Sequence, residues 1–464
     1  MTATIPGSSL PASPTELPPV TRRASLPVGF RAGGLAAGIK ASGRPDLALA
    51  VTTAGPAAVA AVFTPNAFVA APVRRSRANL AATSGDERGG FGWARAVIST
   101  SGCANAATGA AGDADQAAVG RLVADALDID ASYVLHLSTG IIGTRLPLDK
   151  VAAGLEALVP LLTEDDAGLD AAANALRTTD SVTKVASTTL ELPGPAGAGG
   201  RPDRVTITVS GIAKGVGMIH PNMATMLSVI LTDAAVEPAV LWSLLRPATA
   251  RTWTQLSVDG DTSTNDTVFV LASGARPTVA ITPGSPAAEA LAAGIEAVAR
   301  DLARQQAADG EGATTLLTCH VTGGMDDAEA RAVARAVVSS SLVKAAIHGR
   351  DPNWGRIVGA AGNARLAEAA VLVAAGLSIA EADARAAQPA TVQPDRLRVG
   401  IAGTLVFDGT AGGAVDFDRA FVRAAMDAPE CLVRLDLGLG EGSGEAFGCD
   451  LTETYVRENS EYTT

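Results

Sequence analysis

The sequence predicts an α/β protein from its composition and from two kinds of local pattern. Hydrophobic residues fill 47% of the 464 positions but aromatic residues only 3%, so alanine, valine and leucine must build the core. Helical spacing of these residues predicts helices at Asp113–Leu127 and Pro286–Asp309. Short runs of aliphatic and β-branched residues predict strands at Ala61–Pro65, Ala96–Ser99, Tyr133–Leu137 and Met226–Leu231.

Length and charge narrow the class of function. A chain of 464 residues allows two to three domains and a large core, on a prior of roughly 150 residues per domain. Its net charge of −12 argues against nucleic acid and anionic membranes as partners. No apolar run approaches the roughly 20 residues that a membrane-spanning helix needs. We therefore expect an enzyme that acts on small molecules.

Several common catalytic and metal motifs are absent from the sequence. The four cysteines form no C-x-x-C pair and the four histidines form no HExxH, so we expect no metal, no disulfide framework and buried thiols in a reducing cytoplasm. There is no GxSxG elbow and no glycine-rich loop ending in GK[ST]. The glycines Gly215 and Gly217 are followed by Met218, Ile219 and His220, which breaks a GxGxxG fingerprint. The usual sequences of serine hydrolases, kinases and dehydrogenases are thus missing.

The remaining segments complete the predicted organisation. Met1–Arg23 contains five prolines, so residues 1–25 are predicted to be a disordered tail. The segment from Leu26 to Thr52 is predicted to contain strands and glycine turns. Further predictions are a helix or helical pair at Asp149–Ala175, a surface loop at Pro193–Asp203, a helix at Pro238–Trp253, a polar turn and strand at Ser257–Val270, a helix at Asp326–Leu342 and a partly helical addition at Ala364–Pro394.

The stretch Gly211–Asp233 organises the rest of the chain. It starts in a glycine-punctuated turn, passes through Pro221, and enters the buried strand predicted at Met226–Leu231. Ala224 and Thr225 lie at the join, which places a hydroxyl at the mouth of a buried strand. Local pattern alone favours a loop that feeds a core strand, with Thr225 as a strand-forming residue at its edge.

A chemical role for this threonine can also be derived. If the loop holds the Ala224–Thr225 peptide strained, the Thr225 hydroxyl can attack the Ala224 carbonyl and give an ester that water opens. The product carries a hydroxyl and a free α-amine on one residue. Because the pKa of an α-amine is roughly 7.7–8.0, the amine can act as the base for the hydroxyl.

The stretch resembles the ornithine acetyltransferase (glutamate N-acetyltransferase) family. The residues that match its signature are Lys214, Gly215, Gly217, Met218, Pro221, Ala224, Thr225, Met226 and Leu227. The resemblance implies that the precursor cuts itself between Ala224 and Thr225, and that Thr225 becomes an N-terminal nucleophile. It also implies that Lys214 and Thr225 contact substrate. We reason that Lys214 supplies a cation for a substrate carboxylate.

Other segments carry the same resemblance and extend it from Leu26 to Thr464. Ser138–Gly143 resembles the family's oxyanion turn, which implies that Thr139 and Gly140 form the oxyanion hole; a plain strand-ending turn is the alternative. Ala175–Lys184 resembles a substrate-contacting segment and assigns that role to Thr178, where a Thr-Asp turn is the alternative. The segment His348–Gly362 also matches. The resemblance further implies substrate contacts for Glu311, Asn459 and Thr464, although the polar C-terminus alone reads as a loose tail.

The resemblance also implies a fold and an assembly. The fold is a layered α/β sandwich of the N-terminal-nucleophile type with a smaller C-terminal α/β domain from about residue 320. The self-cleaved fragments are residues 26–224, after the tail, and 225–464. These fragments remain associated and pair into an (αβ)₂ heterotetramer.

The implied reaction moves an acetyl group from N-acetylornithine to glutamate in arginine biosynthesis, through an acetyl-threonine ester and without a cofactor. Some family members also accept acetyl-CoA as donor, and the sequence leaves both donors open. Two alternatives remain at this stage. One is an N-terminal-nucleophile amidohydrolase or aminopeptidase, in which water takes the acyl group. The other is an uncleaved binding or structural protein.

Overall fold

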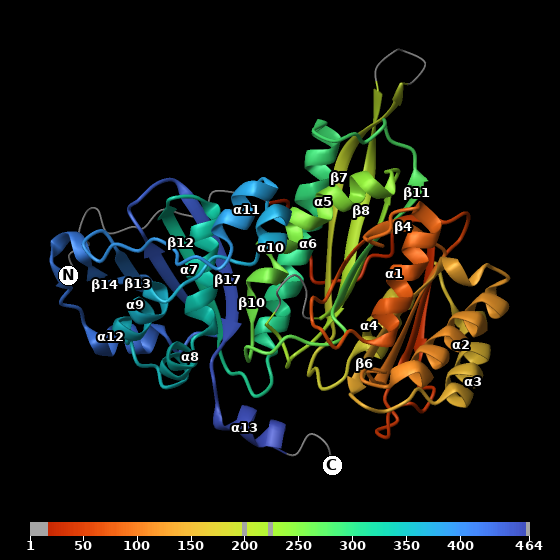
Figure 1. The fold of residues 1–464 in the computed structure, drawn as a ribbon, viewed down its shortest axis with the longest axis horizontal. Coiled ribbons are helices and arrows are strands. Elements are labelled where there is room, and N and C mark those ends of the chain that lie inside the picture. The colour runs from red at the N-terminus through yellow and green to blue at the C-terminus, as the bar shows by residue number, and fades with distance from the viewer. Residues whose placement is uncertain (1–16, 197–201, 221–225, 461–464) are drawn as a thin grey trace. The chain divides into compact units, whose positions relative to one another are not determined.

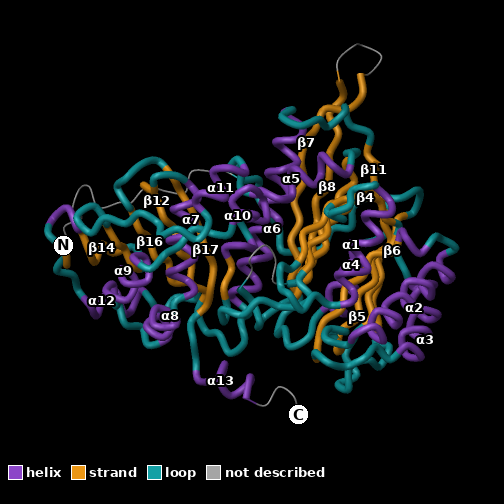
Figure 2. The backbone as a smooth tube through the Cα atoms, in the orientation of Figure 1, coloured by secondary structure: helices purple, strands orange, loops and turns teal. Residues whose placement is uncertain are grey.

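The computed structural model describes residues 17–196, 202–220 and 226–460. These residues form two compact units (Figures 1 and 2). The larger unit comprises 17–249 and 261–306, and the smaller unit comprises 250–260 and 307–460. Each unit contains both helices and strands, in agreement with the α/β prediction.

The larger unit is built on two sheets among the described residues. The first sheet has the order β1 (Phe30–Leu35), β2 (Leu47–Thr52), β5 (Ala96–Cys103) and β6 (Val134–Ile141). The second has the order β4 (Phe91–Ala94), β3 (Ala57–Phe63), β11 (Thr267–Arg276), β9 (Leu227–Ala234), β8 (Pro202–Lys214) and β7 (Lys184–Ala196). The helices of this unit are α1 (Ala71–Ser84), α2 (Gly109–Leu127), α3 (Leu148–Leu158), α4 (Asp166–Leu176) and most of α5 (Pro238–Arg251) and α6 (Pro286–Ala308).

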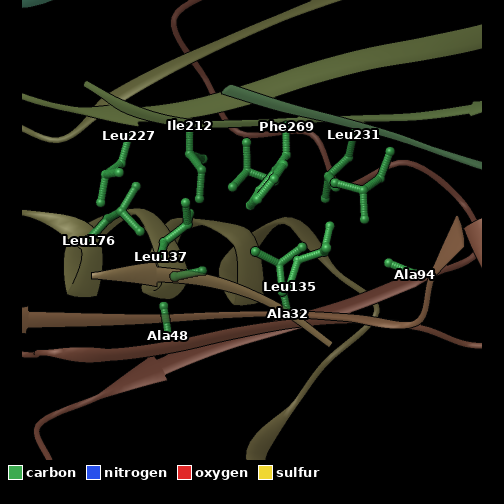
Figure 3. Close-up of a cluster of buried hydrophobic side chains, with 14 of the residues drawn as sticks. Ala32, Ala48, Ala94, Leu135, Leu137, Leu176, Ile212, Leu227, Leu231 and Phe269 are labelled. Atoms are coloured by element: carbon green, nitrogen blue, oxygen red, sulfur yellow. The ribbon is translucent and has the colours of Figure 1, made fainter. Parts of the chain in front are cut away.

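The two sheets face each other across a common apolar core. Figure 3 shows Ile212 and Phe269 of the six-stranded sheet pointing toward Leu137 of β6 and Leu176 of α4. Helices α2 and α3 pack on the four-stranded sheet through a separate apolar cluster. A Cβ atom added to Gly211 of β8 would lie 2.8 Å from Val298, so α6 packs directly on the six-stranded sheet. This arrangement of helix and sheet layers confirms the predicted sandwich.

Strand β9 confirms the apolar run predicted at Met226–Leu231. All eight of its residues are buried, because β9 lies inside the sheet between β8 and β11. It pairs antiparallel with β8 and parallel with β11. A strand that is covered on both faces carries a continuous apolar run instead of an alternating one.

The smaller unit is a second α/β structure. Its sheet has the order β10 (Leu256–Ser257), β17 (Gly442–Cys449), β12 (Leu316–Gly324), β16 (Glu430–Asp436), β13 (Arg398–Ile401), β14 (Thr404–Asp408) and β15 (Gly413–Ala414). Its helices are α7 (Asp327–Ser339), α8 (Ser341–His348), α9 (Trp354–Gly362), α10 (Ala369–Ala374), α11 (Ile379–Arg385), α12 (Arg419–Ala425) and α13 (Glu453–Ser460). Helix α7 begins where the Asp326 carboxylate accepts a hydrogen bond from the Glu329 N–H at 3.0 Å. Helices α10 and α11 form the predicted helical part of the 364–394 addition.

Two predictions about irregular segments are wrong for the described residues. Strand β7 continues to Ala196 and β8 begins at Pro202, so most of the loop predicted at Pro193–Asp203 is a hairpin. Residues 17–25 of the predicted tail pack against the six-stranded sheet. The Thr21 N–H donates to the Ser187 carbonyl at 2.9 Å, and the side chain of Ala24 is fully buried. Proline content predicted disorder for residues 17–25, but an extended, proline-containing segment can still pair with a strand.

The cysteines agree with the prediction of buried thiols. Cys103, Cys319, Cys431 and Cys449 are all buried and form no disulfide. In the described part of the chain, every helix is too short or too polar to cross a membrane.

Candidate active site

The candidate site in the larger unit lies where β6 and β8 end. Thr139 and Gly140 are among the last three residues of β6, and Lys214 is the last residue of β8. The Lys214 ammonium donates a hydrogen bond to the Thr139 hydroxyl oxygen at 2.9 Å. Residues 75 positions apart in the sequence are therefore brought into direct contact.

The contact with Lys214 prepares the Thr139 hydroxyl to donate. An ammonium group can only donate, so the Thr139 oxygen must be the acceptor and its own proton stays available for another partner. A neighbouring positive charge also strengthens that O–H as a donor. These are the properties required of a group that stabilises a developing oxyanion.

Side chains of neighbouring segments hold the backbone of β6 just before this hydroxyl. Strand β6 is at the edge of its sheet among the described residues, and its even-numbered residues direct backbone groups away from β5. The His136 N–H and carbonyl both contact the Ser76 hydroxyl, at 2.8 and 3.1 Å. The Ser138 carbonyl accepts from the Asn265 amide at 2.8 Å. These contacts fix the two residues of β6 that precede and follow Leu137.

Position 140 requires glycine for a steric reason. Its φ is +130°, and a Cβ atom there would lie 2.3 Å from the Gly102 carbonyl carbon on β5. Any larger residue would push the two strands apart. The prediction of a turn that follows the strand is wrong, because β6 extends through both Thr139 and Gly140 to Ile141. Pairing with β5 continues to Ile141, so only Ile142 and Gly143 of the motif form a turn, which the local glycine pattern could not reveal.

Ala224 and Thr225 lie outside the described residues, but the chain on both sides of residues 221–225 is held firmly. The His220 carbonyl accepts from the Thr262 hydroxyl at 3.0 Å, and the Met226 carbonyl accepts from the Thr267 N–H at 2.8 Å. Lys214 pairs with Leu227 across β8 and β9. This register keeps the lysine within a short stretch of chain from residue 225.

Thr178 approaches the same site through a buried carboxylate. The Asp180 side chain accepts from the Thr178 N–H at 3.0 Å, the Gly215 N–H at 2.8 Å and the Lys184 ammonium at 2.7 Å. Burial opposes ionisation of Asp180, but the charges of Lys184 and Lys214 hold the pKa of this carboxyl well below its usual range. Asp180 is therefore a buried anion next to the start of the 215–226 loop.

Lys40 adds a second partly buried cation near these groups. Its ammonium donates to the Pro45 carbonyl at 2.7 Å and also to the Arg177 carbonyl. Burial lowers the pKa of Lys40 to about 8; the charges of Asp46 and Asp180 oppose the shift, and Lys214 reinforces it. Three lysines, Lys40, Lys184 and Lys214, thus face the carboxylates of Asp46 and Asp180, a balance that leaves room for an anionic ligand.

Asn265 and Asp266 complete the interior of the site. The Asn265 amide bridges the carbonyls of Ala104 and Ser138, at 2.6 and 2.8 Å, and so fixes the strand just before Thr139. Asp266 is only 2% exposed. Burial raises the pKa of Asp266 well above its ordinary value, although Ser263 and Lys214 oppose that shift. The segment 257–270 was predicted to be a polar turn and strand. It also supplies the Asn265 amide that fixes β6 and a buried carboxyl group near Lys214.

The other predicted substrate residues are in the smaller unit. The Asn459 amide of α13 donates to the Glu311 carboxylate at 2.9 Å, and Gly312 follows with a φ of +66°. The last eight described residues form helix α13, so this part of the C-terminus is not the loose tail that its polarity suggests. Thr464 lies outside the described residues.

Sequence reasoning missed three residues that shape this site: Asp180, Lys184 and Lys40. Asp180 and Lys184 lie four positions apart in the segment Ala175–Lys184, where the resemblance points to Thr178 alone, and nothing in that spacing indicates that both side chains are buried. Nothing local distinguishes Lys40, because its partners at 45 and 177 meet it only after folding.

Comparison with known proteins identifies the family. The model of the ArgJ family matches residues 31–464. The chain is 45% identical over 441 residues to the arginine biosynthesis bifunctional protein ArgJ of a Synechococcus species, a match that covers 95% of this chain and 97% of that protein. It is 42% identical to the protein of that name from Thermus thermophilus, over 95% of this chain and 99% of that one.

A solved structure, ornithine acetyltransferase complexed with ornithine from Mycobacterium tuberculosis, is 40% identical, with a TM-score of 0.36. That match covers 44% of this chain and 97% of the solved chain. The family match over nearly the whole sequence and the high identity over full length lead to one conclusion: this chain belongs to the ArgJ family.

Proposed function

We propose that this protein cuts itself between Ala224 and Thr225 and then transfers the acetyl group of N-acetylornithine to glutamate. The observation that carries the proposal is the contact between the Lys214 ammonium and the Thr139 hydroxyl, with Gly140 as the next residue of β6. A donor pair of this kind suits the tetrahedral oxyanion of acyl transfer. The names of the full-length relatives, which are bifunctional proteins of arginine biosynthesis, support the substrate class.

In the proposed reaction the Thr225 hydroxyl passes its proton to its own α-amine while its oxygen attacks the acetyl carbon. The oxyanion that forms accepts hydrogen bonds from Thr139 and Gly140. The C–N bond then breaks, the proton goes to the leaving amine, and ornithine departs from an acetyl-threonine ester. The amine of glutamate attacks this ester in turn, and the Thr225 hydroxyl is restored.

Lys214 has two roles in this proposal. Its contact with Thr139 places its charge beside the proposed oxyanion site, and its ammonium together with the nearby Lys40 favours a substrate carboxylate. Thr178, held by Asp180, contacts substrate from the same unit. Glu311, Asn459 and Thr464 complete the substrate contacts.

The finer parts of the proposal concern donor, assembly and location. The name "bifunctional" for the relatives favours acetyl-CoA as a second donor. The fragments that precede and follow the cut remain associated and pair into an (αβ)₂ heterotetramer. The protein works in the cytoplasm and needs no metal or cofactor for either half-reaction.

The proposed double displacement predicts an acetyl-enzyme. Mixing purified protein with N-acetylornithine alone should add the mass of one acetyl group to the fragment that starts at Thr225, and glutamate should remove it. Initial rates with both substrates should give parallel double-reciprocal lines, because one nucleophile serves donor and acceptor in turn. Release of acetate instead of N-acetylglutamate would support the hydrolase alternative. Intersecting lines without any acetylated fragment would contradict the mechanism.

Removal of the C-terminal segment should separate self-cleavage from transfer. Deleting Asn459–Thr464 removes the amide that contacts Glu311 but leaves Lys214, Thr139 and Gly140 unchanged. We expect two fragments on a denaturing gel and a loss of nearly all acetyl transfer. The point variant Asn459→Ala should lose part of kcat/KM, roughly 10-fold for a hydrogen bond to a charged group. Glu458→Ala, at the neighbouring exposed position, is the matched control and should stay at the wild-type rate. A truncated chain with full activity would exclude a role for this segment.

A further inference from the structure

A single buried carboxylate joins the segments that the proposed reaction uses. Asp180 lies in the connection between α4 and β7 and is 1% exposed. One of its oxygens accepts from the Gly215 N–H and the Lys184 ammonium, and the other accepts from the Thr178 N–H. The Thr178 hydroxyl is 3.4 Å from the second oxygen. Two neutral backbone donors and one ammonium thus converge on one anion.

The three partners of Asp180 come from different parts of the site. Thr178 is a proposed substrate contact, and Gly215 begins the loop that contains the proposed scissile bond. Gly215 directly follows Lys214, whose ammonium holds the Thr139 hydroxyl. With a φ of +137°, Gly215 has a backbone conformation in which the hydrogen bond to Asp180 helps to fix the direction of the loop. The carboxylate therefore controls where the loop leaves β8.

Stability does not explain the pair of Asp180 and Lys184. Both side chains are completely inaccessible to solvent. Removing two charges from water is unfavourable, and well-packed apolar residues at such positions often give equal or greater stability. A buried ion pair is better explained by the geometry that it imposes on its neighbours, and here those neighbours are Thr178 and Gly215.

We infer that Asp180 is a positioning residue for both self-cleavage and acetyl transfer, and that Lys184 holds its carboxylate in place. The carboxylate sets the course of the Lys214–Gly215 segment, and through Lys214 it sets the orientation of the Thr139 hydroxyl. Within the described part of the chain, its hydrogen bonds go to Thr178, Lys184 and Gly215, and it acts through them. The role in acetyl transfer rests on the proposed function. The role in self-cleavage rests on the geometry of the Lys214–Gly215 segment alone.

Two variants separate positioning from folding. Asp180→Asn keeps one acceptor oxygen but cannot accept from both backbone donors, and it leaves the Lys184 charge buried without its anion. The double variant Asp180→Asn/Lys184→Met removes both charges, so its thermal midpoint should return toward that of the wild type. Asp115→Asn is the matched control, because Asp115 is also a buried carboxylate of the larger unit and its side-chain partner among the described residues is Arg145, at 2.6 Å.

We expect self-cleavage and kcat to fall about 100-fold in both variants, as for a misplacement of about 1 Å, and KM to rise because Thr178 loses its hold. Cleavage is followed by intact mass after expression, and kcat is referred to the cleaved fraction. Asp115→Asn should cleave and turn over as the wild type does. A double variant that cleaves and turns over at the wild-type rate would overturn the inference, and so would one that fails to fold, because Asp180 would then be structural. If the wild-type chain transfers no acetyl group, the proposed function fails, whereas the cleavage time course still tests Asp180.

Discussion

Replacing Thr225 with alanine is expected to give a single uncut chain of 46.4 kDa with no acetyl transfer. Without the hydroxyl, neither the Ala224 carbonyl nor the acetyl carbon meets a nucleophile. The wild-type protein should instead run as two fragments of similar size, residues 1–224 and 225–464. This prediction has the largest effect because cutting and transfer depend on the same oxygen atom.

Thr225→Ser is the matched variant for this test. Serine keeps the hydroxyl and, after cutting, the α-amine, so it should cleave and transfer at a reduced rate. N-terminal sequencing of the second fragment checks the position of the cut. A start at any residue other than Thr225, or normal transfer by the uncut alanine variant, would contradict the proposed nucleophile.

Thr139→Val should reduce kcat by 10²–10³-fold, about 2.7–4 kcal/mol, while KM changes little. Valine keeps the shape of the side chain but removes the donor that faces the proposed oxyanion. The hydrogen bond from this hydroxyl strengthens as negative charge develops on the oxyanion in the transition state. Its loss should therefore appear in kcat and not in KM. Steady-state kinetics with N-acetylornithine and glutamate measures this effect.

The control for this variant is Thr188→Val. Thr188 is also buried in the larger unit, and its hydroxyl donates to the Pro19 carbonyl at 2.8 Å, so the substitution changes a similar contact outside the site. It should leave kcat unchanged. Lys214→Met should lower kcat and also raise KM, because it loses both of its proposed roles, and its effect on kcat should be less than additive with that of Thr139→Val because the two groups are in contact. Fully additive losses, or a change in KM alone, would remove Thr139 from the oxyanion site.

Much of the secondary structure followed from local patterns. The run at 226–231 is apolar without alternation, and it became the fully buried strand β9. The 286–309 pattern became helix α6, and the helical pair at 149–175 became α3 and α4. These predictions succeed because the spacing of apolar residues within one segment indicates a helix or a strand without reference to distant parts of the chain. The signature around Thr225 likewise needed only its own residues to suggest the chemistry.

Contacts between distant residues determined the rest. Gly140 is in a strand and not in a turn, because pairing with β5 continues through Gly102, almost 40 positions away. Residues 17–25 are ordered because they meet β7 at Ser187. Asp180 has no unusual sequence environment, yet folding brings it to Gly215, and burial then makes its charge depend on Lys184. Composition and spacing describe neighbours along the chain. The hydrogen-bond partners and the low-dielectric surroundings that turn a side chain into part of a site arise only when separate strands pack together.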